Sequence, residues 1–267
     1  MALSSELRGF ANRHPQLKTV LKTLAAPFRQ STSSHYVCLA TGEEATAAVE
    51  LQGAWKTESI PALQRKGVDQ SLAAYRRGEP VRNFDVLIDL LRPLTSFDAP
   101  ATLLEVGCSS GYFAEAFEIK ALPVRYSGCD FSPAFVALAS RCYPKLDFRV
   151  ADATALPCDD ASHDIVVSGC CLLHIRDFDK AIAEAARVAR RHVVFHRTPV
   201  VHQASTRFFT KLAYGVKTFE IHFNEQELVS CMRRHGLLVS AIVTLDAGWH
   251  DGDARATKTY LCEKASP

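Results

Sequence analysis

Short apolar runs alternate with helical patterns along the chain from about residue 100 onward. Between the runs, apolar residues recur at helical spacing over 112–121, 132–143 and 177–191. Such alternation is typical of βαβ units, and it predicts an α/β fold built on a mostly parallel sheet. The predicted strands are 101–107, 124–130, 146–151, 164–169 and 192–198.

The segments on either side of this unit have weaker patterns. Before residue 84 the pattern is helical but irregular, which predicts an N-terminal helical extension over 1–83 that packs over the strand ends. The remainder, 84–267, is then one domain. Within it, residues 199–223 show no clear periodicity and are interpreted as an insertion on the substrate side.

The C-terminal part combines a capped helix with two strand-like runs. Asn224 is suited to an N-cap, Glu227 to the N3 position and Gly236 to the residue that follows the helix end. The runs 237–245 and 256–264 predict a closing hairpin that adds antiparallel strands at one sheet edge.

Composition and charge exclude several classes of protein. The 267 residues are 48% hydrophobic and 22% charged, as in an ordinary globular protein. The net charge of +2 comes from charges spread along the chain, so neither nucleic acid nor a membrane is an expected partner. No apolar run has the length of a membrane span, and the N-terminus does not resemble a secretion signal. These features predict a cytoplasmic protein.

The cysteines are expected to be reduced and mostly structural. There are nine, an odd number, and they are irregularly spaced. A zinc site is the alternative, but no C-x-x-C pair occurs and the spacing fits no common site, so no metal is predicted. The residues considered for zinc are Cys158, His163, Cys170, Cys171 and His174.

The stretch 107–111, Gly-Cys-Ser-Ser-Gly, is compatible with two kinds of chemistry. It fits G-x-S-x-G, the turn that exposes a nucleophilic serine in α/β-hydrolases, with Ser109 as the nucleophile. It also fits a glycine turn from a strand into a helix that cradles a nucleotide-like ligand. No oxyanion-hole motif precedes the turn, and the first convincing strand of the alternation leads straight into it. The ligand-binding interpretation is therefore favoured.

Asp130 supports this interpretation because it ends the second predicted strand, 19 residues beyond Gly111. An acid at this offset can accept hydrogen bonds from both hydroxyls of a ribose. The alternative is that Asp130 only caps the helix that opens at Ser132-Pro133. A dinucleotide is disfavoured, because Ser109 and Tyr112 replace two glycines of G-x-G-x-x-G.

Three consecutive stretches carry a family resemblance: LLEVGCSSGYF, YSGCDFSPAFVALAS and FRVADATALPCDDASHDIVVSGCCLLHI. They resemble, in order, the motifs of class I S-adenosylmethionine-dependent methyltransferases of the small-molecule group. The resemblance implies a Rossmann-like three-layer sandwich with a seven-stranded, mostly parallel sheet. It also implies S-adenosylmethionine as cofactor and a small-molecule acceptor, methylated at O, N, S or C. A non-catalytic protein that binds the same cofactor remains the alternative, and the oligomeric state is unknown.

The resemblance also implies roles for individual residues. Glu105 and the turn Gly107, Cys108, Ser109 and Gly111 would surround the methionine part of the cofactor. Asp130 would bind the ribose, Phe131 the adenine face, and Asp152 with the backbone of Ala153 the adenine edge, while Ser168 would face the methyl-transfer channel.

Candidates on the acceptor side are less well defined. His174, after the fourth predicted strand, is the candidate general base, although a satisfied loop histidine is the alternative. His196 and His222 have weaker claims to contact the substrate. Trp55 and Tyr214 are candidates for a lid over the acceptor.

Overall fold

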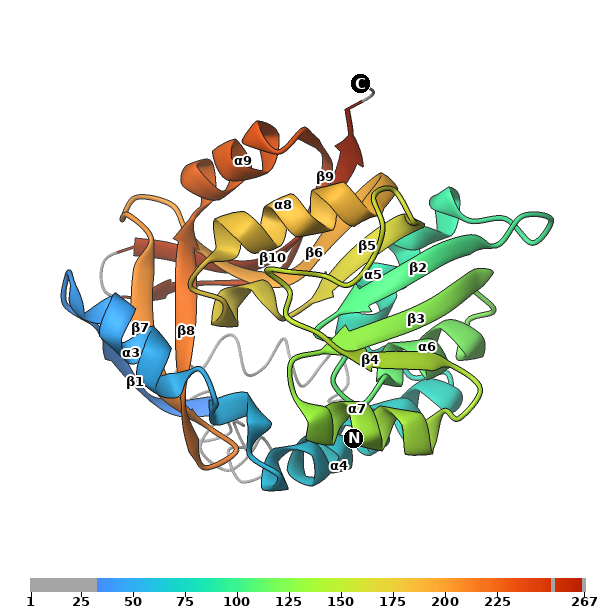
Figure 1. Cartoon of the computed structure of the whole chain (residues 1–267), viewed down its shortest axis with the longest axis horizontal. Coiled ribbons are helices and arrows are strands. Elements are labelled where there is room, and N and C mark those ends of the chain that lie inside the picture. The colour runs from blue at the N-terminus through green and yellow to red at the C-terminus, as the bar shows by residue number, and fades with distance from the viewer. Residues whose placement is uncertain (1–32, 251–252, 266–267) are drawn as a thin grey trace, which may run out of the picture. The chain divides into compact units, whose positions relative to one another are not determined.

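The computed structural model describes residues 33–250 and 253–265. The first 32 residues of the predicted extension and the turn of the predicted closing hairpin at 251–252 lie outside the described residues. The chain from His35 onward forms one compact unit, which is shown in Figure 1.

The predicted strands form the parallel part of a mixed sheet. In sheet order they are β4 (Asp147–Val150), β3 (Val124–Asp130), β2 (Ala101–Val106), β5 (His163–Gly169) and β6 (Ala189–Val201). The C-terminal hairpin completes the far edge with β10 (Asp253–Lys264), which pairs antiparallel with β6, and β9 (Leu237–His250), which pairs antiparallel with β10. Together these strands are the mostly parallel sheet that the resemblance implies.

The sheet continues beyond this set, and the prediction for 199–223 missed it. Strands β7 (Arg207–Ala213) and β8 (Val216–Asn224) form a hairpin there, and β1 (Ser33–Cys38) pairs with β7, so the sheet has 10 strands. The turn at Tyr214-Gly215 has positive φ at both residues, as a tight two-residue hairpin requires. Along β8, polar residues alternate with apolar ones from Thr218 to Phe223, and both sets are buried, so the polar positions do not mark a face exposed to solvent.

The β7–β8 hairpin is joined to β6 over a short length only. Val200 pairs with Phe223 and Val201 with Asn224, beyond the residues of β6 that pair with β5. The hairpin therefore lies past the carboxyl end of β5, on the side of the sheet where ligands of open α/β folds bind.

Helices cover both faces of the sheet, as a three-layer sandwich requires. Helices α8 (Phe178–Val188) and α9 (Glu225–Arg234) bury their apolar residues with Val166, Val193 and Phe195. On the other face, α5 (Arg82–Leu91) and α6 (Tyr112–Ile119) pack against Ile165 and Val194. Figure 1 shows α8 on the near face and α5 behind the strands.

The described part of the extension holds β1, then α3 (Glu43–Leu51), the 3-10 helix η2 (Ala54–Lys56) and α4 (Ser59–Arg76). The expectation of a purely helical extension was therefore incomplete. Leu72 and Tyr75 of α4 belong to the core that α5 and α6 form, so this helix shares a core with the domain. The remaining elements of the described chain are η3 (Arg92–Leu94), α7 (Pro133–Cys142) and η4 (Leu172–His174).

The predicted helix ends are found in the structure. The Asn224 side chain accepts from the Glu227 backbone N–H at 3.0 Å, and Gly236 follows α9 with φ 73°. Among the described residues, no helix is both long and apolar enough to cross a membrane.

Candidate functional site

The glycine turn connects β2 to α6 in a conformation that depends on its glycines. Gly107 and Gly111 have φ of 73° and 70°, in the left-handed region. The backbone N–H groups of Gly107 and Cys108 donate to the Cys129 carbonyl at 2.8 and 2.9 Å. A Cβ at Gly107 would lie 2.4 Å from the Cys171 Cβ, so a larger residue cannot fit here without a shift.

Asp130 holds this turn against the end of β3. Its Oδ2 accepts from the Ser109 backbone N–H at 2.8 Å, and its Oδ1 accepts from that of Ser132 at 2.9 Å. Burial raises the pKa of the Asp130 carboxyl, while the two N–H donors act in the opposite direction. Each carboxylate oxygen keeps acceptor capacity for a second donor, so this residue fits the two hydroxyls of a ribose.

Ser109 is linked to the extension. Its hydroxyl donates to Gln64 Oε1 on α4, an amide oxygen that cannot act as the base of a hydrolase. Sequence reasoning missed Gln64, because nothing in the irregular pattern of the extension marks it. The same helix is tied to the domain through Arg65, which donates to the Tyr143 hydroxyl at 3.1 Å.

Glu105 lies beneath the turn and is almost fully buried, at 2% exposure. It accepts from the Tyr126 hydroxyl at 2.5 Å, and burial raises its pKa to about 8. Gly169 of β5 lies against it, since a Cβ there would be 2.4 Å from Glu105 Oε1. At neutral pH the group is therefore largely protonated, which suits a neutral partner beneath the turn better than an ion pair.

The residues predicted for adenine follow β3 and β4. The Lys56 ammonium lies 3.8 Å from the centroid of the Phe131 ring, so a cation from η2 covers one face of this ring. Asp152 is exposed, and its Oδ1 accepts from the backbone N–H of Thr154 at 2.8 Å. Ala153 is partly buried beside it. Sequence reasoning missed Lys56, which no motif indicates.

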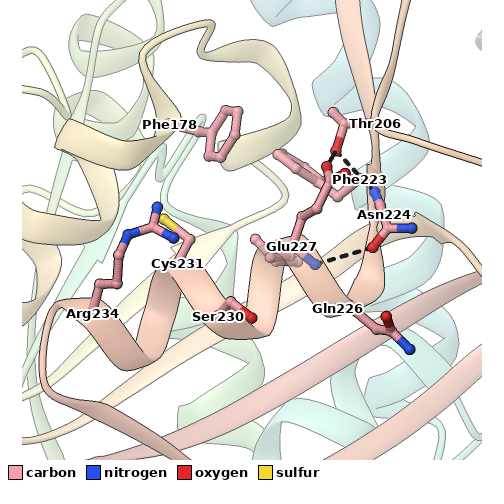
Figure 2. Close-up of a pocket in the computed structure, with 10 residues that line it drawn as sticks. Phe178, Thr206, Phe223, Asn224, Gln226, Glu227, Ser230, Cys231 and Arg234 are labelled. Carbon is pink, nitrogen blue, oxygen red and sulfur yellow. Dashed lines mark hydrogen bonds between the residues drawn. The ribbon is translucent and has the colours of Figure 1, made fainter.

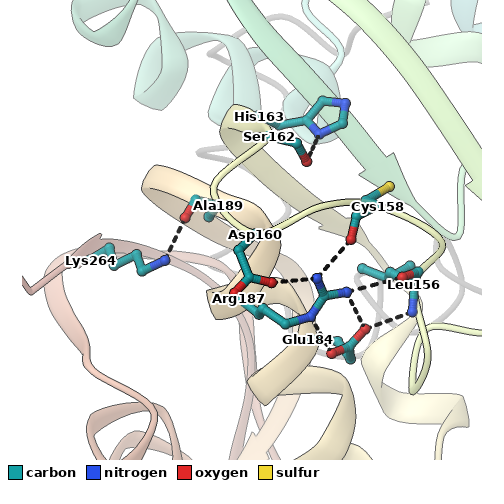
Figure 3. A network of polar contacts seen from close by, with 9 residues as sticks. All are labelled: Leu156, Cys158, Asp160, Ser162, His163, Glu184, Arg187, Ala189 and Lys264. Carbon is teal, nitrogen blue, oxygen red and sulfur yellow. Dashed lines mark hydrogen bonds and ion pairs between the residues drawn. The ribbon is translucent and has the colours of Figure 1, made fainter.

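Arg187 of α8 fixes the loop that follows Asp152 and Ala153, as Figure 3 shows. Its guanidinium donates to the backbone carbonyls of Leu156 at 3.0 Å and Cys158 at 2.7 Å. Glu184 accepts from Arg187 and also from the Leu156 N–H. These carboxylate contacts raise the pKa of Arg187, and it stays charged. The network gives the predicted adenine loop one defined path.

His174 lies in η4 and contacts the hairpin insertion. Its Nδ1 is 2.8 Å from the Phe219 carbonyl of β8, and its ring centroid is 4.6 Å from that of Trp55. A carbonyl can only accept, so Nδ1 carries the proton and Nε2 has the free lone pair. Burial lowers the pKa of His174 to about 4, which keeps the ring neutral at pH 7. The structure thus brings two predicted residues, His174 and Trp55, together.

The other acceptor-side candidates lie apart from this pair. His222 is on β8 and approaches Glu220 Oε1 at 2.9 Å, while Glu220 is also paired with the buried Lys211. His196 contacts Thr259 Oγ1 at 2.9 Å and the ring of Phe113 beneath the sheet. This contact places His196 on the opposite face of β6 from α8.

Two further predicted residues lie at strand ends. Ser168 is buried near the end of β5, paired with Val106 of β2, next to the glycine turn. Tyr214 forms the tip of the β7–β8 hairpin. The buried ion pair of Lys211 and Glu220 was missed by sequence reasoning, because its partners belong to a segment whose strands were not predicted.

The cysteines considered for zinc do not converge. Within the described part of the chain, Cys158, His163, Cys170, Cys171 and His174 form no group of three ligand atoms close enough to share an ion. The described cysteines are all free, in keeping with the expectation of reduced thiols.

Comparison with known proteins gives a match over the segment that holds this site. The family described as "Methyltransferase domain" matches residues 104–196. The matched segment includes the glycine turn, Asp130 and Ser168. This finding confirms the family and the cofactor that the sequence motifs predicted, S-adenosylmethionine.

Individual relatives are similar over part of their length. A probable S-adenosylmethionine-dependent methyltransferase of Mycolicibacterium smegmatis is 37% identical over 93 residues, which is 35% of each chain. The malonyl-[acyl-carrier protein] O-methyltransferase of Hahella chejuensis is 28% identical over 152 residues, 54% of each chain. The ajmaline N-methyltransferase of Rauvolfia serpentina is 33% identical over 100 residues, 34% of this chain and 33% of that one. The chain thus spans from about a third to about half of these relatives.

Solved structures support the fold. The 1,6-didemethyltoxoflavin-N1-methyltransferase of Burkholderia thailandensis, solved with S-adenosylhomocysteine, has a TM-score of 0.52 at 16% identity and covers 85% of this chain and 92% of its own. A methyltransferase of Clostridium acetobutylicum reaches 0.55 at 12% identity, over 76% of this chain and 99% of its own. These likenesses confirm the predicted fold class.

Proposed function

We propose that this chain transfers a methyl group from S-adenosylmethionine to a small-molecule acceptor. The observation that carries the proposal is the convergence of the glycine turn with Asp130, whose carboxylate closes the turn and keeps acceptor capacity for a ribose. A hydrolase built on Ser109 is not proposed, because the Ser109 hydroxyl donates to the Gln64 amide.

The cofactor-binding half consists of the ends of β2, β3, β4 and β5. Asp130 would bind the ribose, the turn from Gly107 to Gly111 the methionine part, and the loop at Asp152 and Ala153 the adenine edge. Phe131 would contact the adenine face once Lys56 leaves the ring or through the face that Lys56 does not cover. Glu105, largely protonated, would donate a hydrogen bond beneath the turn.

The acceptor-binding half is assigned to the hairpin β7–β8, to η4 and to the segment 35–58. When bound, the cofactor supplies a methyl group whose sulfur leaving group needs no proton. Alignment of the acceptor and exclusion of water are then the main tasks of the protein, with a base required only for a protonated acceptor. His174 fits the role of base, because its neutral ring has Nε2 unprotonated and Nδ1 fixed on Phe219.

The acceptor itself is proposed only as a class. The relatives include enzymes named for O-methylation of malonyl-[acyl-carrier protein] and N-methylation of ajmaline. An O–H or N–H acceptor loses a proton on methylation, and the unprotonated nitrogen of His174 can take it, whereas a thiolate acceptor needs no base.

Two measurements test the proposal in sequence. Titration calorimetry with S-adenosylhomocysteine is expected to show one site, and absence of binding at millimolar ligand would contradict the cofactor assignment. Mass spectrometry of S-adenosylhomocysteine formed with pools of metabolites then searches for the acceptor. Binding without turnover in any pool would favour the non-catalytic alternative.

A further inference from the structure

Three metal-ligating side chains meet between α8 and α9, away from the residues assigned to methyl transfer. Asp179 comes from the first turn of α8 and Cys231 from α9, and His235 directly follows α9. Their ligand atoms all lie within 4.8 Å of one another. In the part of the chain that the structure describes, this is the one group of three such residues at that spacing.

Two contacts of Asp179, each to a different carboxylate oxygen, have lengths close to the ligand–ligand edges of a tetrahedral metal site. Cys231 Sγ lies 3.2 Å from Asp179 Oδ1, and His235 Nε2 lies 3.2 Å from Asp179 Oδ2. Bond lengths of about 2.0 to 2.3 Å around tetrahedral zinc give ligand–ligand edges of roughly 3.3 to 3.6 Å. Because the proposed site uses one carboxylate oxygen, a rotation of the Asp179 side chain together with small movements of Cys231 and His235 would bring all three ligands onto one ion. Cys231 and His235 are four residues apart, which places them on one side of α9.

In the absence of a metal ion, the negative charge of the Asp179 carboxylate is neutralised by Arg234. Arg234 donates to Asp179 Oδ1 at 2.9 Å, and its side chain is 62% exposed, so it can leave without a large cost in burial. Arg234 and a metal ion would then compete for one carboxylate. Figure 2 shows the Arg234 guanidinium beside the Cys231 side chain.

A pocket lies on the same side. Cys231 and Arg234 both line a pocket of about 540 Å³, whose wall includes Phe178, Asn224, Gln226 and Ser230 (Figure 2). The three candidate ligands thus lie beside a pocket that two residues of the cluster line, although Cys231 as a residue is only 2% exposed.

We propose that Asp179, Cys231 and His235 form a binding site for a zinc-like divalent transition-metal ion. The ion would bind through one sulfur, one carboxylate oxygen and one imidazole nitrogen, with water as the fourth ligand. On binding, the Cys231 thiol loses its proton to the solvent, and Arg234 leaves Asp179. The ion would join α8 to α9 in place of the present hydrogen bonds, so its effect is on stability and not on the methyl-transfer residues.

Cobalt(II) is the first probe, because a thiolate ligand gives it a charge-transfer band in the near ultraviolet and tetrahedral binding gives visible bands. One cobalt per chain is expected in the low micromolar range or tighter, displaced by zinc, with an increase in melting temperature on zinc addition. Cys231→Ser is expected to remove the thiolate band and to weaken binding by about 100-fold. Cys38→Ser, at an exposed cysteine on β1, is the matched control and should change neither result.

Arg234→Gln separates a metal site from a hydrogen-bond network. Removal of the competing guanidinium should strengthen metal binding by about tenfold, whereas a purely structural cluster predicts no gain. If Cys231→Ser does not fold, Asp179→Asn and His235→Gln at the partly exposed ligands give the same test. A cobalt spectrum without a thiolate band, or one that Cys231→Ser leaves intact, would overturn the proposal. Failure here leaves the cofactor-binding measurements unaffected, because those are made without added metal.

Discussion

The cofactor-binding half and the acceptor-binding half of the proposed site are held together by different kinds of contact. In the first, residues at the ends of adjacent parallel strands bond mainly to nearby backbone, as Asp130 does to Ser109 and Ser132. In the second, His174 is fixed by Phe219, which lies 45 positions further along the chain, and contacts Trp55 of the extension. Local motifs thus specify the cofactor half, whereas the acceptor half depends on how distant segments meet.

The largest expected effect is the loss of cofactor affinity on substitution of Asp130. Asp130→Ala would remove the acceptor of two ribose hydroxyls, each charge-assisted hydrogen bond contributing about 1.5 to 3 kcal/mol. Because such contributions are rarely additive, we expect a loss of roughly 2 to 4 kcal/mol, or about 30- to 1,000-fold in affinity for S-adenosylhomocysteine. Titration calorimetry measures it.

The same variant also loses two backbone contacts within the turn, so its stability must be measured beside its affinity. A melt of the ligand-free protein should show a modest decrease, in the range of about 1 to 3 kcal/mol for two unsatisfied donors. Normal affinity in a folded Asp130→Ala protein would remove this residue from the site. Asp152→Ala provides a comparison of affinity and stability within the same half, because Asp152 is also an acid but is exposed and has only local contacts.

His174 is the corresponding test of the acceptor half. His174→Gln keeps an N–H donor for the Phe219 carbonyl but has no basic nitrogen. With an acceptor that must lose a proton, kcat should fall by about 100-fold, the low end for general-base catalysis because the pKa of His174 is as low as about 4. Affinity for S-adenosylhomocysteine should change little, and steady-state kinetics with calorimetry compares the two. Equal loss of binding and turnover would place His174 in the cofactor half.

Much of the cofactor half was predictable from sequence for a physical reason. The strand, the glycine turn and the acid at the end of the next strand are close in sequence, and a parallel sheet brings the carboxyl ends of β2 and β3 to one edge. The predicted strands, the cap at Asn224 and the closing hairpin follow from the same local rules.

The acceptor half was less well predicted, although β8 has the alternating pattern of a strand. Thr218, Glu220 and His222 alternate with Phe219, Ile221 and Phe223, yet all six are buried. The polar members of β8 are satisfied inside the protein, as Glu220 is by Lys211 and His222, so polarity did not mark an exposed face. Gln64 and Lys56 act through contacts with distant loops and belong to no motif.

The dependence of stability on pH tests two buried histidines, His174 against the β7–β8 hairpin and His196 beneath the sheet. Burial lowers the pKa of His174 to about 4 and of His196 to about 3. An unfolded histidine titrates near 6.5, so between that pH and the folded pKa the unfolded chain binds more protons. Stability therefore falls as the pH decreases from about 6.5 toward 4, by about tenfold or more in the unfolding equilibrium per histidine.

Thermal melts between pH 7.5 and 5 would measure this dependence. His174→Gln should flatten the curve in part and leave the contribution of His196. Because the acceptor-side ring is fixed by one hydrogen bond to the hairpin, an unchanged curve in His174→Gln would mean that His174 titrates normally in solution. His174 would then be a stronger base than proposed. Its ring would also be less buried between η4 and the hairpin than the contact with Phe219 indicates.

The smallest expected effect lies at the contact between the two halves, where Lys56 of the extension covers one face of Phe131. If adenine uses that face, Lys56 must leave it, at a cost of about 0.5 to 1 kcal/mol for an exposed cation–π contact. Lys56→Met removes the charge and keeps a flexible apolar chain, so affinity for S-adenosylhomocysteine should rise by about two- to fivefold in calorimetry. Lys66→Met, at a neighbouring lysine on α4, controls for the change in net charge. Weaker binding in Lys56→Met alone would mean that the ammonium contacts the ligand itself, and the extension would then belong to the cofactor half as well.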